Sequence, residues 1–151
     1  MDSSKELIII TGVSGAGKSS AMAFMEDAGY YCIDNMPPEL MSTFVSLLAN
    51  NSEYYPKVAM VVDIRSGYVF EKIIASIDSV EQYGYTCKIV YLDINDTEAL
   101  KRYKLTRRKH PFADKFNGNI QNALDYEREI LAPLRLKADH IIDTSGIDTH
   151  Q

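Results

Sequence analysis

The segment from Gly12 to Ser19 constrains the fold more than any other part of the chain. Its sequence, GVSGAGKS, matches the phosphate-binding P-loop pattern G-x-x-x-x-G-K-[ST]. Glycines permit positive φ angles and let backbone N–H groups approach phosphate oxygens closely. Lys18 would span the β- and γ-phosphates, and the Ser19 hydroxyl would ligate Mg²⁺. We therefore expect Mg²⁺ with ATP or GTP to bind Gly12, Val13, Ser14, Gly15, Ala16, Gly17, Lys18 and Ser19.

A P-loop lies between a strand and a helix, and both are indicated here. Leu7–Thr11 is an apolar run without polar alternation, as in parallel strands that are covered on both faces. Ser19–Ala28 has a helical pattern that ends at Gly29. Its predicted buried face consists of Ala21, Phe24, Met25 and Ala28.

The rest of the chain continues the alternation of strands and helices. Further strands are predicted at Tyr30–Ile33, Lys57–Ile64, Lys88–Asp93 and His140–Asp143. Four more helices are predicted. The first starts near Pro38 and buries Leu40, Met41, Phe44, Val45, Leu47 and Leu48, and the second spans Tyr68–Tyr83. The third runs from an Asn95 cap to about Thr106, and the fourth spans Ile120–Lys137, with Asn119 as its cap and an interruption or kink at Pro133.

Five such strands predict an α/β fold: a three-layer P-loop NTPase domain over residues 1–151, with a five-stranded parallel sheet and a nucleotide-kinase-like arrangement. No helix is predicted after the fifth strand, although domains of this kind usually end on one. We therefore expect a truncated chain, with more protein beyond Gln151.

Composition excludes a disordered tail, a collagen-like fibre and a disulfide scaffold. The 151 residues are 46% hydrophobic and 25% charged, which is typical of one ordinary globular domain. The N-terminus is polar, and no apolar run approaches the ~20 residues of a membrane span. We expect a cytoplasmic protein. Cys32 and Cys87 lie in apolar stretches, which favours buried free thiols over a catalytic cysteine or a disulfide.

A P-loop also requires an acidic partner for the metal ion at the end of a neighbouring strand. Asp63 is the best candidate, because five apolar residues precede it and the third strand of such folds normally lies beside the first. Asp93 and Asp143 also end strands, where caps for the next helix or turn are the favoured interpretation. Asp34 with Asn35 could hold an acceptor substrate, but the following Met-Pro-Pro favours a turn.

Positive charge is concentrated in one segment. Residues 101–110 hold six Lys and Arg and no acid, so with a formal net charge of −5 the other residues together carry −11. Lys101, Arg102 and Lys104 fit a solvated helix face. Arg107 and Arg108 occupy the place of a lid over the triphosphate, where arginines neutralise transition-state charge. A nucleic-acid surface is less favoured, because the body is acidic.

Several of these segments together resemble one family. GVSGAGKSSA, EDAGYYCIDNMPPEL, VVDIRS, TRRKHP, ILAPLR and IIDTSG are similar to the RapZ/YvcJ family of bacterial P-loop nucleotide-binding proteins, from Leu7 to the C-terminus. The resemblance implies binding and usually weak hydrolysis of ATP and GTP, and a second, C-terminal domain. Its second nucleotide segment falls on Asp63, Ile64, Arg65 and Ser66, of which Ser66 is at a variable place.

The resemblance also implies an adapter role, since some members bind small regulatory RNAs and present them to a ribonuclease. That role belongs to the family's C-terminal half, so any RNA or protein partner is expected there. Three hypotheses follow: a regulatory NTPase domain with weak activity, a small-molecule or nucleotide kinase, and a small-RNA-binding adapter. The first is preferred, with Lys18, Asp63, Arg107 and Arg108 as catalytic residues and Ser19 and Asp63 as metal ligands. Oligomeric state and the choice between ATP and GTP stay open.

Overall fold

The computed structural model describes residues 5–13, 16–37, 40–50, 54–62, 69–106 and 113–145. Strands and helices alternate along the chain, as the apolar pattern predicts. The strands are β1 (Lys5–Gly12), β2 (Tyr31–Met36), β3 (Lys57–Val62), β4 (Tyr85–Asp93) and β5 (His140–Asp143). The helices are α1 (Lys18–Asp27), α2 (Met41–Asn50), α3 (Val69–Gln82), α4 (Asp96–Thr106), the 3₁₀ helix η2 (Ala113–Phe116) and α5 (Ile120–Lys137).

The strands form one parallel sheet in the order β2-β3-β1-β4-β5. This confirms the predicted five-stranded sheet and the placement of the third strand beside the first. The centre of the sheet is apolar on both faces: Leu7 and Ile9 of β1 point to one face and Ile8 and Ile10 to the other, and all four are at most 8% exposed. Strands buried in this way need cover on both faces, which explains their uninterrupted apolar sequence.

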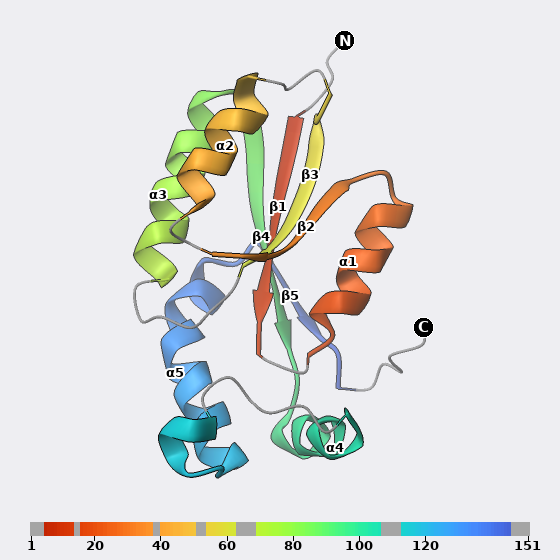
Figure 1. Cartoon of the computed structure of the whole chain (residues 1–151), viewed down its shortest axis with the longest axis vertical. Coiled ribbons are helices and arrows are strands. Elements are labelled where there is room, and N and C mark those ends of the chain that lie inside the picture. The colour runs from red at the N-terminus through yellow and green to blue at the C-terminus, as the bar shows by residue number, and fades with distance from the viewer. Residues whose placement is uncertain are drawn as a thin grey trace.

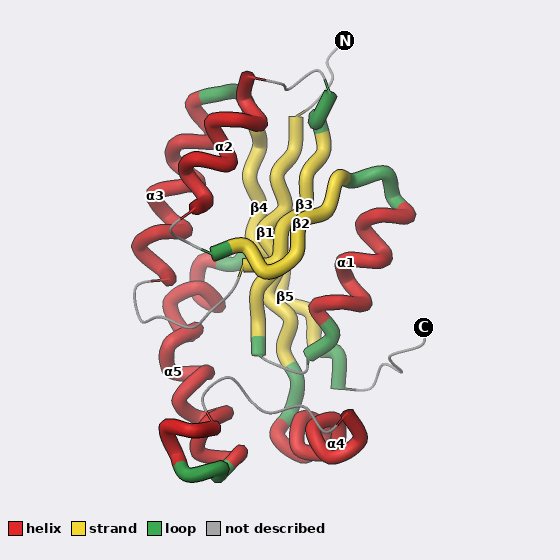
Figure 2. The backbone as a smooth tube through the Cα atoms, viewed as in Figure 1, coloured by secondary structure: helices red, strands yellow, loops and turns green. Residues whose placement is uncertain are grey.

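Helices cover the two faces unequally. Figures 1 and 2 show α2, α3 and α5 on one side of the sheet, α1 on the other, and α4 near its carboxyl edge. This follows from right-handed crossovers, because the chain moves toward the β2 edge after β1 and in the opposite direction after β2, β3 and β4. The connections that leave β1 and β3 therefore diverge, and the carboxyl ends of these neighbouring strands form the switch point where such sheets bind ligands.

Two predicted helix caps are confirmed. The Asn95 Oδ1 accepts a hydrogen bond from the Glu98 N–H at 2.8 Å, and the Asn119 Oδ1 accepts one from the Asn122 N–H at 3.0 Å. The predicted interruption at Pro133 is wrong, since α5 continues through it to Lys137. Leu131 and Leu134 on either side of it are fully buried, so packing holds the helix together across the missing N–H donor.

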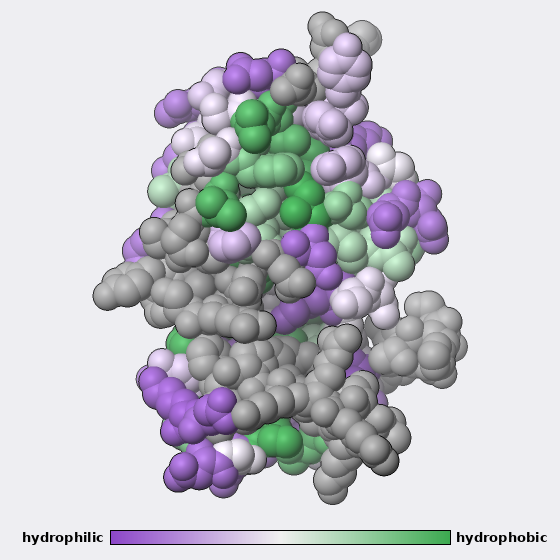
Figure 3. Space-filling model, in the orientation of Figure 1, coloured by the Kyte–Doolittle hydropathy of each residue, from purple (hydrophilic) through white to green (hydrophobic). Residues whose placement is uncertain are grey.

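The predicted buried faces of α1 and α2 are only partly right. On α2, Met41, Val45 and Leu48 are buried, whereas Leu40 just before the helix and Leu47 are more than half exposed. Figure 3 shows apolar side chains gathered on the surface in this upper part of the molecule. On α1, Phe24 of the predicted core face is 70% exposed. Ala21 and Met25 of the predicted face pack against the core, whereas Ala28 is exposed, and the buried residue of this helix is Met22, which lies outside the predicted face.

An ionic contact fastens α5 to the start of α4. The Arg128 guanidinium donates to Asp96 Oδ1 and to the Ile94 carbonyl, and Gln121 Nε2 donates to Asp96 Oδ2 at 2.8 Å. The Gln121 hydrogen bond and the Arg128 contacts hold the pKa of Asp96 below its usual range. A carboxyl group with a depressed folded-state pKa stabilises the fold above its unfolded pKa and loses that contribution as pH falls through the folded pKa.

We therefore expect Asp96→Asn to lower the free energy of unfolding at pH 7 by about 1 kcal/mol, a value discounted for partial solvent screening. The difference from the parent protein should begin to shrink as pH falls below about 4, the ordinary pKa of an aspartate, and should vanish only once pH has fallen below the depressed folded-state pKa, where the Asp96 carboxyl is neutral. Urea unfolding at pH 7 and pH 3.5 measures both quantities. A difference that does not change with pH would show that the Asp96 charge contributes nothing.

Candidate functional site

The P-loop begins where β1 has no room for a side chain. Gly12 has φ +145°, and a Cβ placed on it would lie 2.1 Å from the Leu92 carbonyl oxygen of β4. The next residue continues the contact, since the Val13 N–H donates to the same oxygen at 3.2 Å. The Ala16 N–H then donates to the Val13 carbonyl at 3.0 Å, and Val13 and Ala16 are fully buried. Backbone hydrogen bonds thus hold the loop at Val13, on its strand side, and at Ala16, on its helix side.

The loop leads directly into the N-terminus of α1. Gly17 is the N-cap of this helix, with φ +95°, and as a glycine it makes no side-chain cap hydrogen bond. The positive end of a helix and the N–H groups of its first turn together favour an anion. The described part of the loop therefore has a backbone path compatible with a phosphate cradle, and phosphate binding there stays a prediction.

Lys18 and Ser19 follow at the first turn of α1. The Lys18 ammonium donates to the Gly12 carbonyl at 3.0 Å, so it lies folded back over the loop. Ser19, the predicted metal ligand, is exposed. Among the described residues, no group of three or more His, Cys, Asp or Glu could hold a metal ion. Mg²⁺ that is bound through nucleotide phosphates needs only one or two protein ligands, so a site with Ser19 as its described ligand fits this ion.

Thr144, directly after β5, braces the P-loop from the far side. Its hydroxyl lies 2.7 Å from the Ala16 carbonyl and 3.2 Å from the Asp93 carbonyl, and its N–H donates to the latter at 2.9 Å. The Thr144 carbonyl accepts from Arg102 Nη2 of α4 at 2.8 Å. One residue therefore connects the P-loop, the end of β4 and α4.

Thr144→Val should lower the free energy of unfolding by about 1 kcal/mol, because it removes the hydroxyl and leaves the Ala16 carbonyl without this donor. Thr144→Ser keeps the hydroxyl and is the matched control, expected to stay close to the parent protein. Urea unfolding of the three proteins decides the matter. An equal loss in the serine variant, which keeps the hydroxyl and lacks only the methyl group, would show that methyl packing contributes as much as the hydroxyl bond and would contradict this prediction.

The sequence alone does not predict this brace. Arg102 was predicted on a solvated helix face, but its side chain is only 11% exposed and pairs with Glu98 at 3.6 Å as well as with Thr144. That prediction is wrong, because the partner carbonyl lies 42 residues away in sequence and only the fold brings it close. Threonine after a strand-ending aspartate gave no signal that distinguishes a brace from an ordinary turn residue.

Asp143, which ends β5, caps the following turn as predicted, whereas Asp93, which ends β4, combines a local contact with ion pairs to α5. The Asp93 Oδ1 accepts from the Ile94 N–H at 2.8 Å, and Asp93 also lies within ion-pair distance of Arg128 and Arg135. The Asp143 Oδ1 accepts from the Ser145 N–H, and bonds from Ser145 lower the Asp143 pKa. Asp34 differs from expectation: β2 continues to Met36, so Asp34 lies within a strand, beside a register shift, rather than in a turn.

Other predicted site residues lie outside the described parts of the chain. These residues are Ser14, Gly15, Asp63, Ile64, Arg65, Ser66, Arg107 and Arg108, and they remain predictions. The structure does place the strand that leads to Asp63, because Val61 of β3 pairs with Ile10 of β1. The chain therefore leaves β3 beside the strand that carries the P-loop.

The two cysteines are free thiols, as predicted, although both are half-buried rather than fully buried. Burial, with the nearby charges of Glu81 and Asp139, raises the pKa of Cys87 to about 12. Burial, with the charge of Glu26, also raises the pKa of Cys32. A thiol that stays protonated at neutral pH is a poor nucleophile, which supports a structural role for both.

Comparison with known proteins places these features in context. A family model described as the RapZ-like N-terminal domain matches residues 5–151. A "Nucleotide-binding protein" of Alkaliphilus oremlandii is 44% identical over 97% of this chain and 50% of its own length. A "Nucleotide-binding protein" of Finegoldia magna is 44% identical over 94% of this chain and 49% of its own length. The chain thus spans about half the length of the curated relatives it matches.

Solved structures support the fold. A shikimate kinase from Acinetobacter baumannii superposes with a TM-score of 0.54 at 17% identity, covering 96% of this chain and 87% of its own. At this identity the likeness shows a P-loop kinase-like fold and nothing about substrate. Within the part of the chain that the structure describes, no helix combines the length and the apolar character that crossing a membrane requires.

Proposed function

The chain belongs to the RapZ-like N-terminal domain family, and from this membership and its P-loop we propose that it binds ATP or GTP with Mg²⁺ and hydrolyses the nucleotide slowly. The observation that carries the proposal is the cradle at the end of β1. There Gly12 lies against β4, Gly17 caps α1 without a side chain of its own, and Lys18 lies over the loop.

Binding requires a movement of Lys18. Its ammonium now donates to the Gly12 carbonyl, and a triphosphate in the cradle would draw it to the β- and γ-phosphates. The N–H groups at the start of α1 would face the same phosphates, and Ser19 would ligate the metal ion. Bound Mg²⁺ would neutralise charge that develops on the phosphate oxygens.

Hydrolysis would also involve the predicted site residues that follow β3 and α4. Asp63 would complete the metal site, and Arg65 or the lid arginines Arg107 and Arg108 would meet developing charge on the transferred group. The motifs supply phosphate ligands but no group placed to activate water. We therefore expect slow turnover, which suits a regulatory nucleotide-binding domain better than a metabolic kinase.

Incubation with γ-labelled ATP or GTP and candidate metabolites tests this proposal. Label should appear in free phosphate whatever acceptor is present, and should require Mg²⁺. Transfer of the label to a metabolite would replace hydrolysis with kinase activity, for which the fold also provides the scaffold. Absence of both binding and turnover with either nucleotide would refute the proposal.

For the whole protein we propose a regulatory role of the RNase-adapter type. Family membership supports it, and the RNA or protein partner would bind the half of the relatives that lies beyond this domain. RNA binding by the 151-residue chain alone, lost on replacing Arg107 and Arg108, would move the RNA role into this domain instead.

A further inference from the structure

The peptide unit between Ala16 and Gly17 lies where the P-loop meets α1. Its carbonyl belongs to Ala16, which is fully buried, and its N–H belongs to Gly17, the N-cap of α1. This peptide bond is trans. The C=O and the N–H of a trans peptide point in opposite directions, so a contact that fixes one of them also fixes the other. Whatever holds the Ala16 carbonyl therefore sets the direction of the Gly17 N–H.

The Thr144 hydroxyl provides that contact. It lies 2.7 Å from the Ala16 carbonyl oxygen and 3.2 Å from the Asp93 carbonyl oxygen, and its single proton can be donated to only one of them. The Asp93 oxygen already accepts from the Thr144 N–H at 2.9 Å. The shorter distance and the existing donor at Asp93 both assign the hydroxyl proton to the Ala16 carbonyl.

This hydrogen bond gives the peptide the orientation that a phosphate site requires. In a phosphate cradle the N–H groups face the interior of the loop and the carbonyls face outward. With the Ala16 carbonyl directed outward to Thr144, the Gly17 N–H is directed to the opposite side of the peptide. Gly17 itself does not fix this orientation, because a residue without a Cβ lets the peptide turn either way. The contact with Thr144 does.

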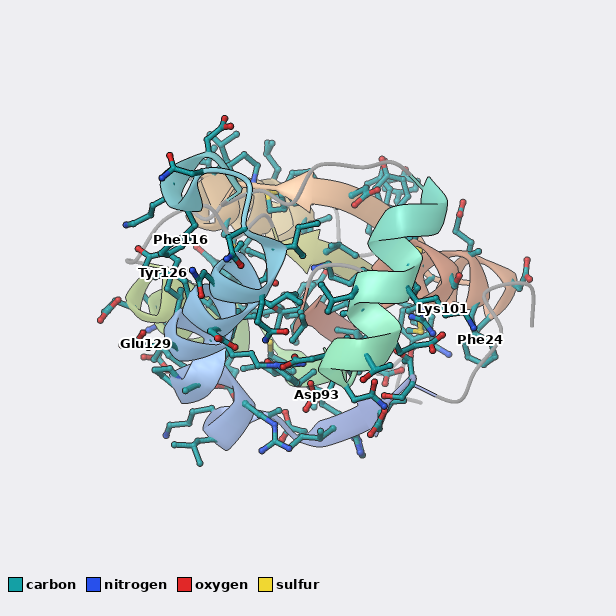
Figure 4. All side chains as sticks on the ribbon, turned by 90° about the horizontal axis from the view of Figure 1, so that it is seen from below. Phe24, Asp93, Lys101, Phe116, Tyr126 and Glu129 are labelled. Carbon is teal, nitrogen blue, oxygen red and sulfur yellow. The ribbon has the colours of Figure 1, made fainter. Side chains whose placement is uncertain are left out.

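The backbone of Thr144 is held without the use of its hydroxyl. Its N–H donates to the Asp93 carbonyl, and its own carbonyl accepts from Arg102 Nη2 of α4 at 2.8 Å. The next residue is fixed as well, since the Ser145 hydroxyl oxygen accepts from the Asn95 N–H at 2.8 Å. Figure 4 views this region from below, with Asp93 between α4 and α5. Loss of the hydroxyl alone should therefore leave the segment after β5 in place.

We propose that Thr144 is a positioning residue for phosphate binding, because its hydroxyl holds the peptide between Ala16 and Gly17 so that the Gly17 N–H faces a bound phosphate. The proposal rests on the proposed function, since this N–H acts only on a phosphate in the P-loop. Thr144 does not itself contact the ligand. Without its hydroxyl the peptide is free to turn, and a carbonyl oxygen, which repels an anion, then replaces an N–H donor beside the phosphate.

Binding of inorganic tripolyphosphate with Mg²⁺, compared with ATP or GTP with Mg²⁺, tests the proposal. Isothermal titration calorimetry gives each Kd. We expect Thr144→Val to weaken binding of every one of these ligands by about five- to tenfold, the effect of one hydrogen bond. Thr144→Ser restores the hydroxyl and should bind like the parent protein. Asp96→Asn, which is expected to lower stability by a similar amount through contacts with α5, is the matched control and should also bind like the parent.

The other outcomes overturn the proposal in recognisable ways. Unchanged affinity of Thr144→Val for tripolyphosphate refutes it, and a loss confined to the nucleotides assigns the hydroxyl to the base or the sugar instead. Equal weakening by Asp96→Asn assigns the effect to stability, and equal weakening by Thr144→Ser assigns it to the methyl group.

Two further comparisons keep the experiment decisive. Thr144→Ala removes the hydroxyl without placing a methyl group against the Ala16 carbonyl, and it replaces Thr144→Val should that variant fold poorly. A parent protein that binds neither tripolyphosphate nor nucleotide refutes the proposed function and this inference with it. A parent protein that binds them as tightly as both hydroxyl-free variants do refutes this inference alone.

Discussion

Lys18→Ala is expected to abolish the thermal stabilisation that Mg²⁺ with ATP or GTP gives the parent protein. The ammonium is the one flexible cation that the P-loop motif places over the phosphates, and it already lies over the loop, 3.0 Å from the Gly12 carbonyl. Without it, the triphosphate would keep the backbone N–H groups but lose its charge-assisted partner, which contributes more than a neutral hydrogen bond.

The expected effect is large enough to measure by thermal unfolding. A ligand present at 100 times its Kd stabilises a protein by about 2.7 kcal/mol, which for a domain of this size raises Tm by about 5–10 °C. The substitution itself should change the stability of the nucleotide-free protein by no more than about 1 kcal/mol, since the Lys18 side chain is only half-buried where its ammonium contacts the Gly12 carbonyl. The loss should therefore appear as a missing ligand shift.

Lys101→Ala is the matched control. It removes the same charge from an exposed position on α4 and should leave the nucleotide shift unchanged. An undiminished shift in the Lys18 variant would refute the P-loop assignment. An equal reduction in both variants would attribute the effect to net charge rather than to a phosphate ligand.

Much of the fold could be predicted because the determining signals are local. An uninterrupted apolar run specifies a doubly covered strand, and Asn119 caps α5 through contacts three residues apart, so both are visible in sequence. The P-loop is likewise contiguous, and its glycines follow from a backbone path that needs positive φ. Such local signals do not depend on which distant segments pack against them.

What could not be predicted depends on segments that meet only in the folded chain. Arg102 has the sequence of a solvated helix residue, and its burial results from the Thr144 carbonyl placed there by β5. Phe24 has the helical position of a core residue, and its exposure results from the absence of cover over the described part of that face. Periodicity reports which side of a helix is apolar, but it does not report what lies opposite.

Gly12→Ala is expected to be the most destabilising single-methyl change among the glycines that the structure describes with their surroundings. The new Cβ would lie 2.1 Å from the Leu92 oxygen, 2.8 Å from its nitrogen and 2.9 Å from its carbonyl carbon. These atoms are backbone of the adjacent central strand, so relief requires β1 and β4 to separate where they pair. We expect a loss of at least about 4 kcal/mol, which is comparable to the whole stability of a small domain.

Gly29→Ala separates steric conflict from backbone strain. Gly29 also has positive φ, at +94°, but a Cβ there would meet nothing within 4 Å. Its replacement should cost only about 1–2 kcal/mol, the penalty of a left-handed conformation for a residue with a side chain. Urea unfolding of both variants followed by circular dichroism gives the comparison. If the two losses were equal, strain alone would explain the glycine at the start of the P-loop; a much larger loss at Gly12 would show that this glycine is required by the close approach of β4.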